Sequence, residues 1–137
     1  MINDLLMIDD DDISLKIVSL TVKRYHFAQH ISTMKNGKEG LAYLEDLVVR
    51  EKAPPSLIFL DINMPVMDGW EFLEEYTQRF ENYFPQTSIC MLTSSLDPKD
   101  QEKASRYPSV IAFISKPIIL DNMAMLRSHP RLRYFFK

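Results

Sequence analysis

Short apolar runs alternate with amphipathic stretches along the whole chain. Apolar runs bounded by turn residues predict strands buried in a sheet, here at residues 5–8, 57–60, 88–92 and 110–114. The mixed and partly alternating segment 27–34 also predicts a strand. Apolar residues at helical spacing predict helices at residues 13–25, 41–48 and 70–80, and further helices starting at 97–98 and 118–121. Strands that alternate with helices indicate parallel βαβ units. We therefore predict a doubly wound α/β fold with helices on both faces of one parallel sheet.

The composition indicates a single domain with an ordinary hydrophobic core. The chain has 137 residues, of which 46% are apolar and 26% are charged. Its formal net charge of -3 gives no support for direct nucleic-acid binding. Cys90 is the only cysteine, which excludes an internal disulfide. The N-terminus lacks the features of a signal peptide, and no stretch is long enough to span a bilayer. We therefore expect a cytoplasmic protein without membrane contact.

Polar side chains follow four of the predicted strands, at the point where each strand ends. They are Asp9 and Asp10, Asp61 and Asn63, Thr93 with Ser94 and Ser95, and Lys116. A parallel sheet brings all these ends to one edge. Crowded carboxylates repel one another, and Mg²⁺ relieves that repulsion because it prefers oxygen ligands. A carboxylate nucleophile, a metal, a lysine and a hydroxyl together suit a transferred phosphoryl group.

The acidic run at residues 9–12 also has a simpler interpretation as an exposed helix start. Acids are favoured at helix N-termini by the helix dipole, and Asp11 or Asp12 can cap the helix. This explains Asp9 and Asp10 less well, because Asp61 supplies a further carboxylate at the same edge of the sheet.

The chain resembles the receiver domains of two-component signalling over essentially its whole length. The segments that carry the resemblance are MIDDDDIS, FLDINMPVMDGWEFL, MLTSS and AFISKP, in the family's order and spacing. The DINMPVMDG and SKP segments together are specific for the family. The resemblance implies a flavodoxin-like (βα)5 sandwich of three layers, with parallel strand order 2-1-3-4-5. It assigns residues 1–130 to the receiver domain and leaves residues 131–137 as a basic and aromatic tail.

The resemblance also implies a role for each acidic residue of the site. Asp61 matches the phospho-accepting aspartate. Asp10 matches a residue that binds Mg²⁺ directly, and Asp9 matches a residue that contributes to the Mg²⁺ site indirectly. Asn63 would offer its backbone carbonyl to the metal, and the turn residues after it would shape the loop that aims this carbonyl.

A second set of matched residues implies a conformational switch. Thr93 matches the hydroxyl that binds the phosphoryl group, and Phe113 occupies the aromatic switch position. Lys116 matches the lysine that meets the phosphoryl group, and the Lys116–Pro117 bond is expected to be cis. Ser95, like Asn63, lines the path of the hydrolytic water in the family.

The function implied is that of a signalling domain rather than an enzyme with a diffusing substrate. Asp61 would take a phosphoryl group from a phosphohistidine on a sensor histidine kinase or a phosphotransfer protein, and self-phosphotransfer and autodephosphorylation would be its only chemistry. The switch would then act on a downstream protein target. The surface formed by the fourth helix, fifth strand and fifth helix is the family's common dimer surface, so a homodimer is possible. Because the chain ends soon after Lys116, we expect a stand-alone receiver.

Two other functions stay open. A receiver-like interaction module that is never phosphorylated is disfavoured by the intact set of Asp10, Asp61, Thr93 and Lys116. An aspartyl-phosphate phosphohydrolase is disfavoured because Asn63 stands where such enzymes have a second acid. The sequence also lacks a GxxxxGK phosphate loop and a GxGxxG fingerprint, which argues against a nucleotide-dependent enzyme.

The segment after Pro130 is unusually basic and aromatic. Pro130 should interrupt the fifth helix. The segment either packs onto the domain or offers a contact surface to a partner, since arginine and aromatic residues are enriched at interface centres.

Overall fold

The computed structural model, which describes residues 1–136, contains a five-stranded parallel sheet in the order β2-β1-β3-β4-β5. The strands are β1 (Ile2–Ile8), β2 (Ala28–Met34), β3 (Leu57–Asp61), β4 (Ser88–Thr93) and β5 (Val110–Ser115). The helices are α1 (Asp12–Arg24), α2 (Gly37–Val49), α3 (Gly69–Arg79), α4 (Pro98–Ser105) and α5 (Leu120–Ser128), followed by a short 3₁₀ helix, η1 (Arg133–Phe136). This order confirms the predicted fold class.

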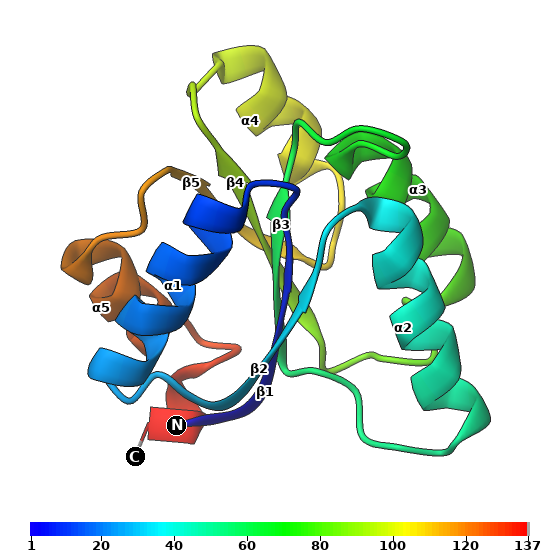
Figure 1. Cartoon of the computed structure of the whole chain (residues 1–137), viewed down its shortest axis with the longest axis horizontal. Helices are drawn as coiled ribbons and strands as arrows, with labels where there is room; N and C mark the ends of the chain where they lie inside the picture. Colours follow the sequence, from blue (N-terminus) through cyan, green and yellow to red (C-terminus); the bar gives the residue numbers. More distant parts are fainter. Residues whose placement is uncertain (137) are drawn as a thin grey trace.

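Helices cover both faces of the sheet. α1 and α5 lie on one face, while α2 and α3 lie on the other (Figure 1). Successive residues of a strand point to opposite faces, and β1 shows this: Leu5 and Met7 join the core under α1 and α5, whereas Leu6 and Ile8 join the core under α2 and α3. Within residues 1–136, no helix has the length and apolarity that crossing a membrane requires.

Two predicted boundaries were wrong for local reasons. β1 begins at Ile2 rather than at residue 5, because Ile2 already pairs with Ala28 across the sheet. The polar Asn3 and Asp4 interrupt the apolar run and hide this start. α2 begins at Gly37, because the side chain of Asn36 accepts a hydrogen bond from the backbone N–H of Glu39 at 2.9 Å and caps the helix.

The two apolar sets on α1 have different environments. Val18 and Val22 are buried together with Leu15 and form the face that packs on the sheet. Ile13, Ile17 and Leu20 are 70%, 45% and 60% exposed. We call these three residues the α1 stripe. Single exposed apolar residues are ordinary, but a row of three along one helix face is a candidate contact surface.

The C-terminal segment packs against the amino end of the sheet. α5 ends at Ser128, before Pro130, and Leu132 is fully buried in the core. The Phe136 ring lies 5.2 Å from that of Phe27. The Arg131 guanidinium donates to the carbonyl oxygen of Pro85 at 2.9 Å. These contacts favour packing onto the domain over a free tail. The boundary at residue 130 stays a prediction, and Lys137 lies outside the described residues.

Candidate functional site

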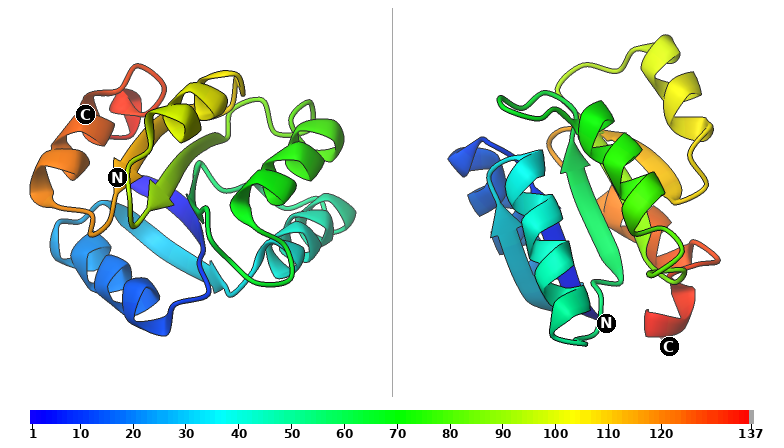
Figure 2. Two further views of the ribbon diagram at one scale, coloured as in Figure 1. Left: turned by 90° about the horizontal axis from the view of Figure 1, so that it is seen from above. Right: turned by 90° about the vertical axis from the view of Figure 1, so that its right-hand side faces the viewer.

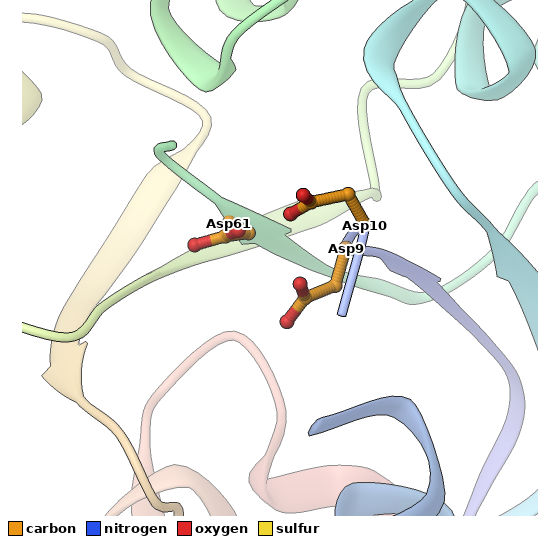
Figure 3. A group of neighbouring side chains, drawn as sticks. All are labelled: Asp9, Asp10 and Asp61. Carbon is orange, nitrogen blue, oxygen red and sulfur yellow. The ribbon is translucent and has the colours of Figure 1, made fainter. Parts of the chain in front are cut away.

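Three carboxylates meet where β1 and β3 leave the sheet (Figure 3). Oxygens of Asp9, Asp10 and Asp61 lie within 4.8 Å of one another. β1 and β3 are neighbours in register, with Ile8 opposite Leu60, so the residues that follow them must be neighbours too. Asp9 is fully buried and Asp61 is 4% exposed, whereas Asp10 is exposed. The predicted clustering of these three acids is therefore present in the structure.

The acidic run at residues 9–12 serves two purposes. Asp11 is the N-cap of α1, and its side chain accepts a hydrogen bond from the backbone N–H of Ile13 at 3.0 Å. Asp9 Oδ1 accepts from the backbone N–H of Asp11 at 3.0 Å, which fixes the buried carboxylate at the start of the helix. Asp12, one residue further, forms an exposed ion pair with Lys35 at 3.0 Å. Only Asp9 and Asp10 of this run belong to the carboxylate cluster.

Lys116 reaches the cluster from the loop after β5. Its ammonium donates to Asp9 Oδ2 at 2.6 Å and lies 3.3 Å from Asp61 Oδ1. The peptide bond from Lys116 to Pro117 is cis. The lysine therefore bridges two buried carboxylates. The sequence analysis expected Lys116 to meet a phosphoryl group and did not predict this bridge.

One lysine does not neutralise this cluster. Burial and the neighbouring Asp9 charge raise the pKa of Asp61 from its ordinary value of 3.8 to about 7, although Lys116 opposes the rise. Burial alone would lower the pKa of Lys116, but its hydrogen bond to Asp9 and the charge of Asp61 outweigh burial and raise it. The site thus carries excess negative charge that a cation would relieve.

The donor atoms at this site fit Mg²⁺. Three carboxylates converge from two strand ends, and one of them, Asp10, faces solvent, where a metal can keep its water ligands. Asn63 follows Asp61 in the β3–α3 loop and is exposed. Asp10, Asp61 and the Asn63 carbonyl would hold the ion directly and Asp9 indirectly, and the ion would offset the negative charge of the site.

Thr93 is the last residue of β4 and is buried. Its hydroxyl donates to the carbonyl oxygen of Ser95 at 2.9 Å and accepts from the backbone N–H of Ser95 at 3.2 Å. The hydroxyl is therefore engaged within its own loop. Phe113 lies on β5, half-buried, and packs against the core under α2 and α3.

Gly69, the first residue of α3, lies directly against the backbone of Asp61. A Cβ atom at position 69 would lie 2.6 Å from the Asp61 carbonyl oxygen and 2.8 Å from Ile62 Cα. The Gly69 N–H donates to the Ile62 carbonyl oxygen at 2.8 Å, which closes the loop. The Asp-Gly pair was predicted only to shape the loop. The structure shows that its glycine also sets how closely α3 approaches Asp61.

An apolar pocket adjoins Lys116. It has a volume of about 340 Å³ and is lined by Ile17 and Val18 of α1, by Pro117 and Ile118, and by Ser14, Ser94 and Lys116. Ile17 of the α1 stripe and Lys116 therefore line the same pocket.

The comparison with known families agrees with this geometry. A family model described as the response regulator receiver domain matches residues 5–126. The chain belongs to the response regulator receiver domain family. A crystal structure of a two-component response regulator from Cytophaga hutchinsonii is 33% identical to this receiver and has a TM-score of 0.85, with 90% of this chain and 92% of that one covered.

Other similar proteins include a histidine kinase and a further response regulator. Histidine kinase CKI1 of Arabidopsis thaliana is 31% identical over 121 residues, which cover 82% of this chain and 11% of that protein. The receiver spans less than half the length of the first curated relatives it matches. Response regulator Rcp1, solved in an Mn²⁺-bound form, shares the fold with 23% identity and a TM-score of 0.72, over 93% of each chain.

Proposed function

We propose that this receiver accepts a phosphoryl group on Asp61 in a reaction that requires Mg²⁺. The donor is a phosphohistidine on a sensor kinase or a phosphotransfer protein. The observation that carries the proposal is the ammonium of Lys116 between two buried carboxylates, Asp9 and Asp61, with Asp10 beside them. Fixed charges of this kind stabilise a transferring phosphoryl group. The Mn²⁺-bound form of the similarly folded Rcp1 supports a divalent metal here.

In the proposed reaction, an ionised Asp61 oxygen attacks the phosphorus atom. The new O–P bond makes an acyl phosphate as the donor's N–P bond breaks, and the leaving imidazole takes up a proton from solvent. Lys116, already 3.3 Å from Asp61 Oδ1, binds one phosphoryl oxygen. The Thr93 hydroxyl leaves the Ser95 carbonyl and donates to another. Phe113 then turns into the space that Thr93 vacates, which changes the surface read by a downstream protein.

Intact mass spectrometry with acetyl phosphate and Mg²⁺ tests this proposal. We expect the wild-type protein to gain one phosphoryl group, and we expect neither Asp61→Asn nor wild-type protein in EDTA to gain one. A wild-type protein that gains none and binds no Mg²⁺ would support the unphosphorylated interaction module. Rapid multiple turnover of generic phosphate esters would support the phosphohydrolase.

The α1 stripe supports a protein donor over a small molecule. A phosphohistidine protein must dock near Asp61, and Ile17 of the exposed stripe also lines the apolar pocket beside Lys116. We expect Leu20→Ser to slow transfer from a phosphorylated histidine protein by about fivefold or more, because truncating a residue that is central to an interface can cost over about 1 kcal/mol. The acetyl phosphate rate should not change. Val49→Ser, on the exposed side of α2, is the control. Equal transfer rates for both variants would exclude the stripe as the docking surface.

The stand-alone arrangement remains a prediction. The mass of the endogenous protein tests it against the 16.0 kDa of this sequence.

A further inference from the structure

α4 buries little of its own surface. It has eight residues, and Ala104 is its only buried residue. A helix that is polar on nearly all sides gains little from packing, so other contacts must hold it in place. In Figure 1 and in the right view of Figure 2, α4 is the outermost element at the end of the molecule where β4 leaves the sheet.

Two side-chain contacts join α4 and the segment just after it to α3. The Lys103 ammonium lies 4.5 Å from the ring centroid of Trp70. The Tyr107 hydroxyl donates to Glu74 Oε2 at 3.0 Å. Trp70 and Glu74 lie four residues apart on one face of α3, whereas Lys103 lies in the last turn of α4 and Tyr107 two residues after its end. We call these two contacts the α3–α4 latch.

The α3 side of the latch is fixed relative to the acceptor. Gly69, directly before Trp70, lies against the Asp61 backbone. Phe72, Leu73 and Tyr76 anchor the rest of α3 in the core. Any movement between the two helices must therefore come from α4.

The α4 side of the latch is connected to Thr93. The Thr93 hydroxyl is bonded to Ser95, which lies in the short loop between β4 and α4. When Thr93 moves toward a phosphoryl group, this bond breaks and the loop must change shape. Trp70 and Tyr107 also pack against the same core cluster as Phe113. The latch thus holds the C-terminal end of α4, and the Thr93 loop leads into the N-terminal end of the same helix.

We propose that the α3–α4 latch holds α4 in the position seen here and opposes the displacement of Thr93, so that loosening the latch favours phosphorylation of Asp61. This inference rests on the proposed function. Phosphorylation and the displaced arrangement of α4 favour each other by linkage, so a variant that weakens the opposing contacts must accept the phosphoryl group more readily.

The test uses Lys103→Gln, Tyr107→Phe and the double variant in the full chain. An exposed cation–π contact or hydrogen bond corresponds to a change of roughly two- to fivefold. We expect each single variant to raise the rate of phosphorylation by acetyl phosphate and Mg²⁺ by that factor, and the double variant to raise it further. Lys99→Gln is the matched control, because it removes an equally exposed lysine from α4. Loss of a cation alone would slow reaction with an anionic donor, so the expected sign is diagnostic.

Hydrogen exchange in α4 provides a readout that does not depend on phosphorylation. Amides of residues 98–105 should exchange faster in the latch variants than in wild-type protein and Lys99→Gln. If exchange stays at the wild-type rate, the latch does not exist, whatever happens at Asp61. If exchange rises but phosphorylation rates stay equal, the latch exists but does not regulate the site. If wild-type protein gains no phosphoryl group while α4 exchange still rises, the proposed function fails and the regulatory claim fails with it.

Discussion

Replacing Lys116 with methionine is expected to destabilise the protein by about 3 kcal/mol and to slow phosphorylation by about a hundredfold or more. The lysine side chain is 19% exposed and lies against Asp9, which is fully buried. Removing one partner of a buried ion pair leaves the other charge uncompensated. Methionine keeps most of the apolar stem, so the loss reports the charge. The cost falls at the lower end for buried pairs, because Asp61 can take up a proton instead.

Urea unfolding at pH 7.5 measures the stability change, and intact mass over time measures the rate. Lys99→Met is the control, since Lys99 is exposed in the first turn of α4. Two results would contradict the account: wild-type stability in Lys116→Met, or an equal loss in both variants.

Replacing Asp61 with asparagine is expected to stabilise the protein at pH 8 without Mg²⁺, by about 1–2 kcal/mol. The pKa of Asp61 is raised from 3.8 to about 7 in the folded protein, so its ionised form is disfavoured by folding. The folded state holds an extra proton between these values, and wild-type stability should fall as the pH rises from about 4 to about 7. Asparagine removes this contribution because it does not titrate.

The comparison is the free energy of unfolding of both proteins from pH 5 to pH 8 in EDTA. The advantage of Asp61→Asn should grow with pH and level off above pH 7, and Mg²⁺ should stabilise wild-type protein more than the variant. Asp121→Asn, an exposed acid at the start of α5, should show no such rise. A constant difference between Asp61→Asn and wild type across this range would show that Asp61 titrates normally.

The sequence predicted the fold and the carboxylate cluster well because both follow from local patterns. Apolar runs mark buried strands, and a parallel sheet places the residues after them at one edge. Asp9, Asp10 and Asp61 could therefore be grouped without coordinates. Their pattern gave no means of separating the buried Asp9 from the exposed Asp10, because burial depends on how α1 leaves β1.

Contacts between distant segments were not predictable in the same way. The strand-end argument placed Lys116 at the same edge as the carboxylates, but it did not show that Lys116 donates to Asp9, 107 positions away. The α1 stripe was hidden for a different reason: two apolar sets share one helix, and only tertiary packing decides which of them faces the sheet. The role of Gly69 could have been suspected, since a glycine at a helix start permits close backbone approach.

The central claim is that Asp61 itself becomes an acyl phosphate, and locating the modified residue tests this most directly. Wild-type protein treated with acetyl phosphate and Mg²⁺ is reduced with borohydride, which converts an aspartyl phosphate to homoserine, and the peptides are sequenced by mass spectrometry. The account predicts homoserine at position 61 and at no other aspartate, and none after treatment in EDTA. Homoserine at position 9 or 10, or none anywhere in protein that retains its fold and binds Mg²⁺, would contradict it.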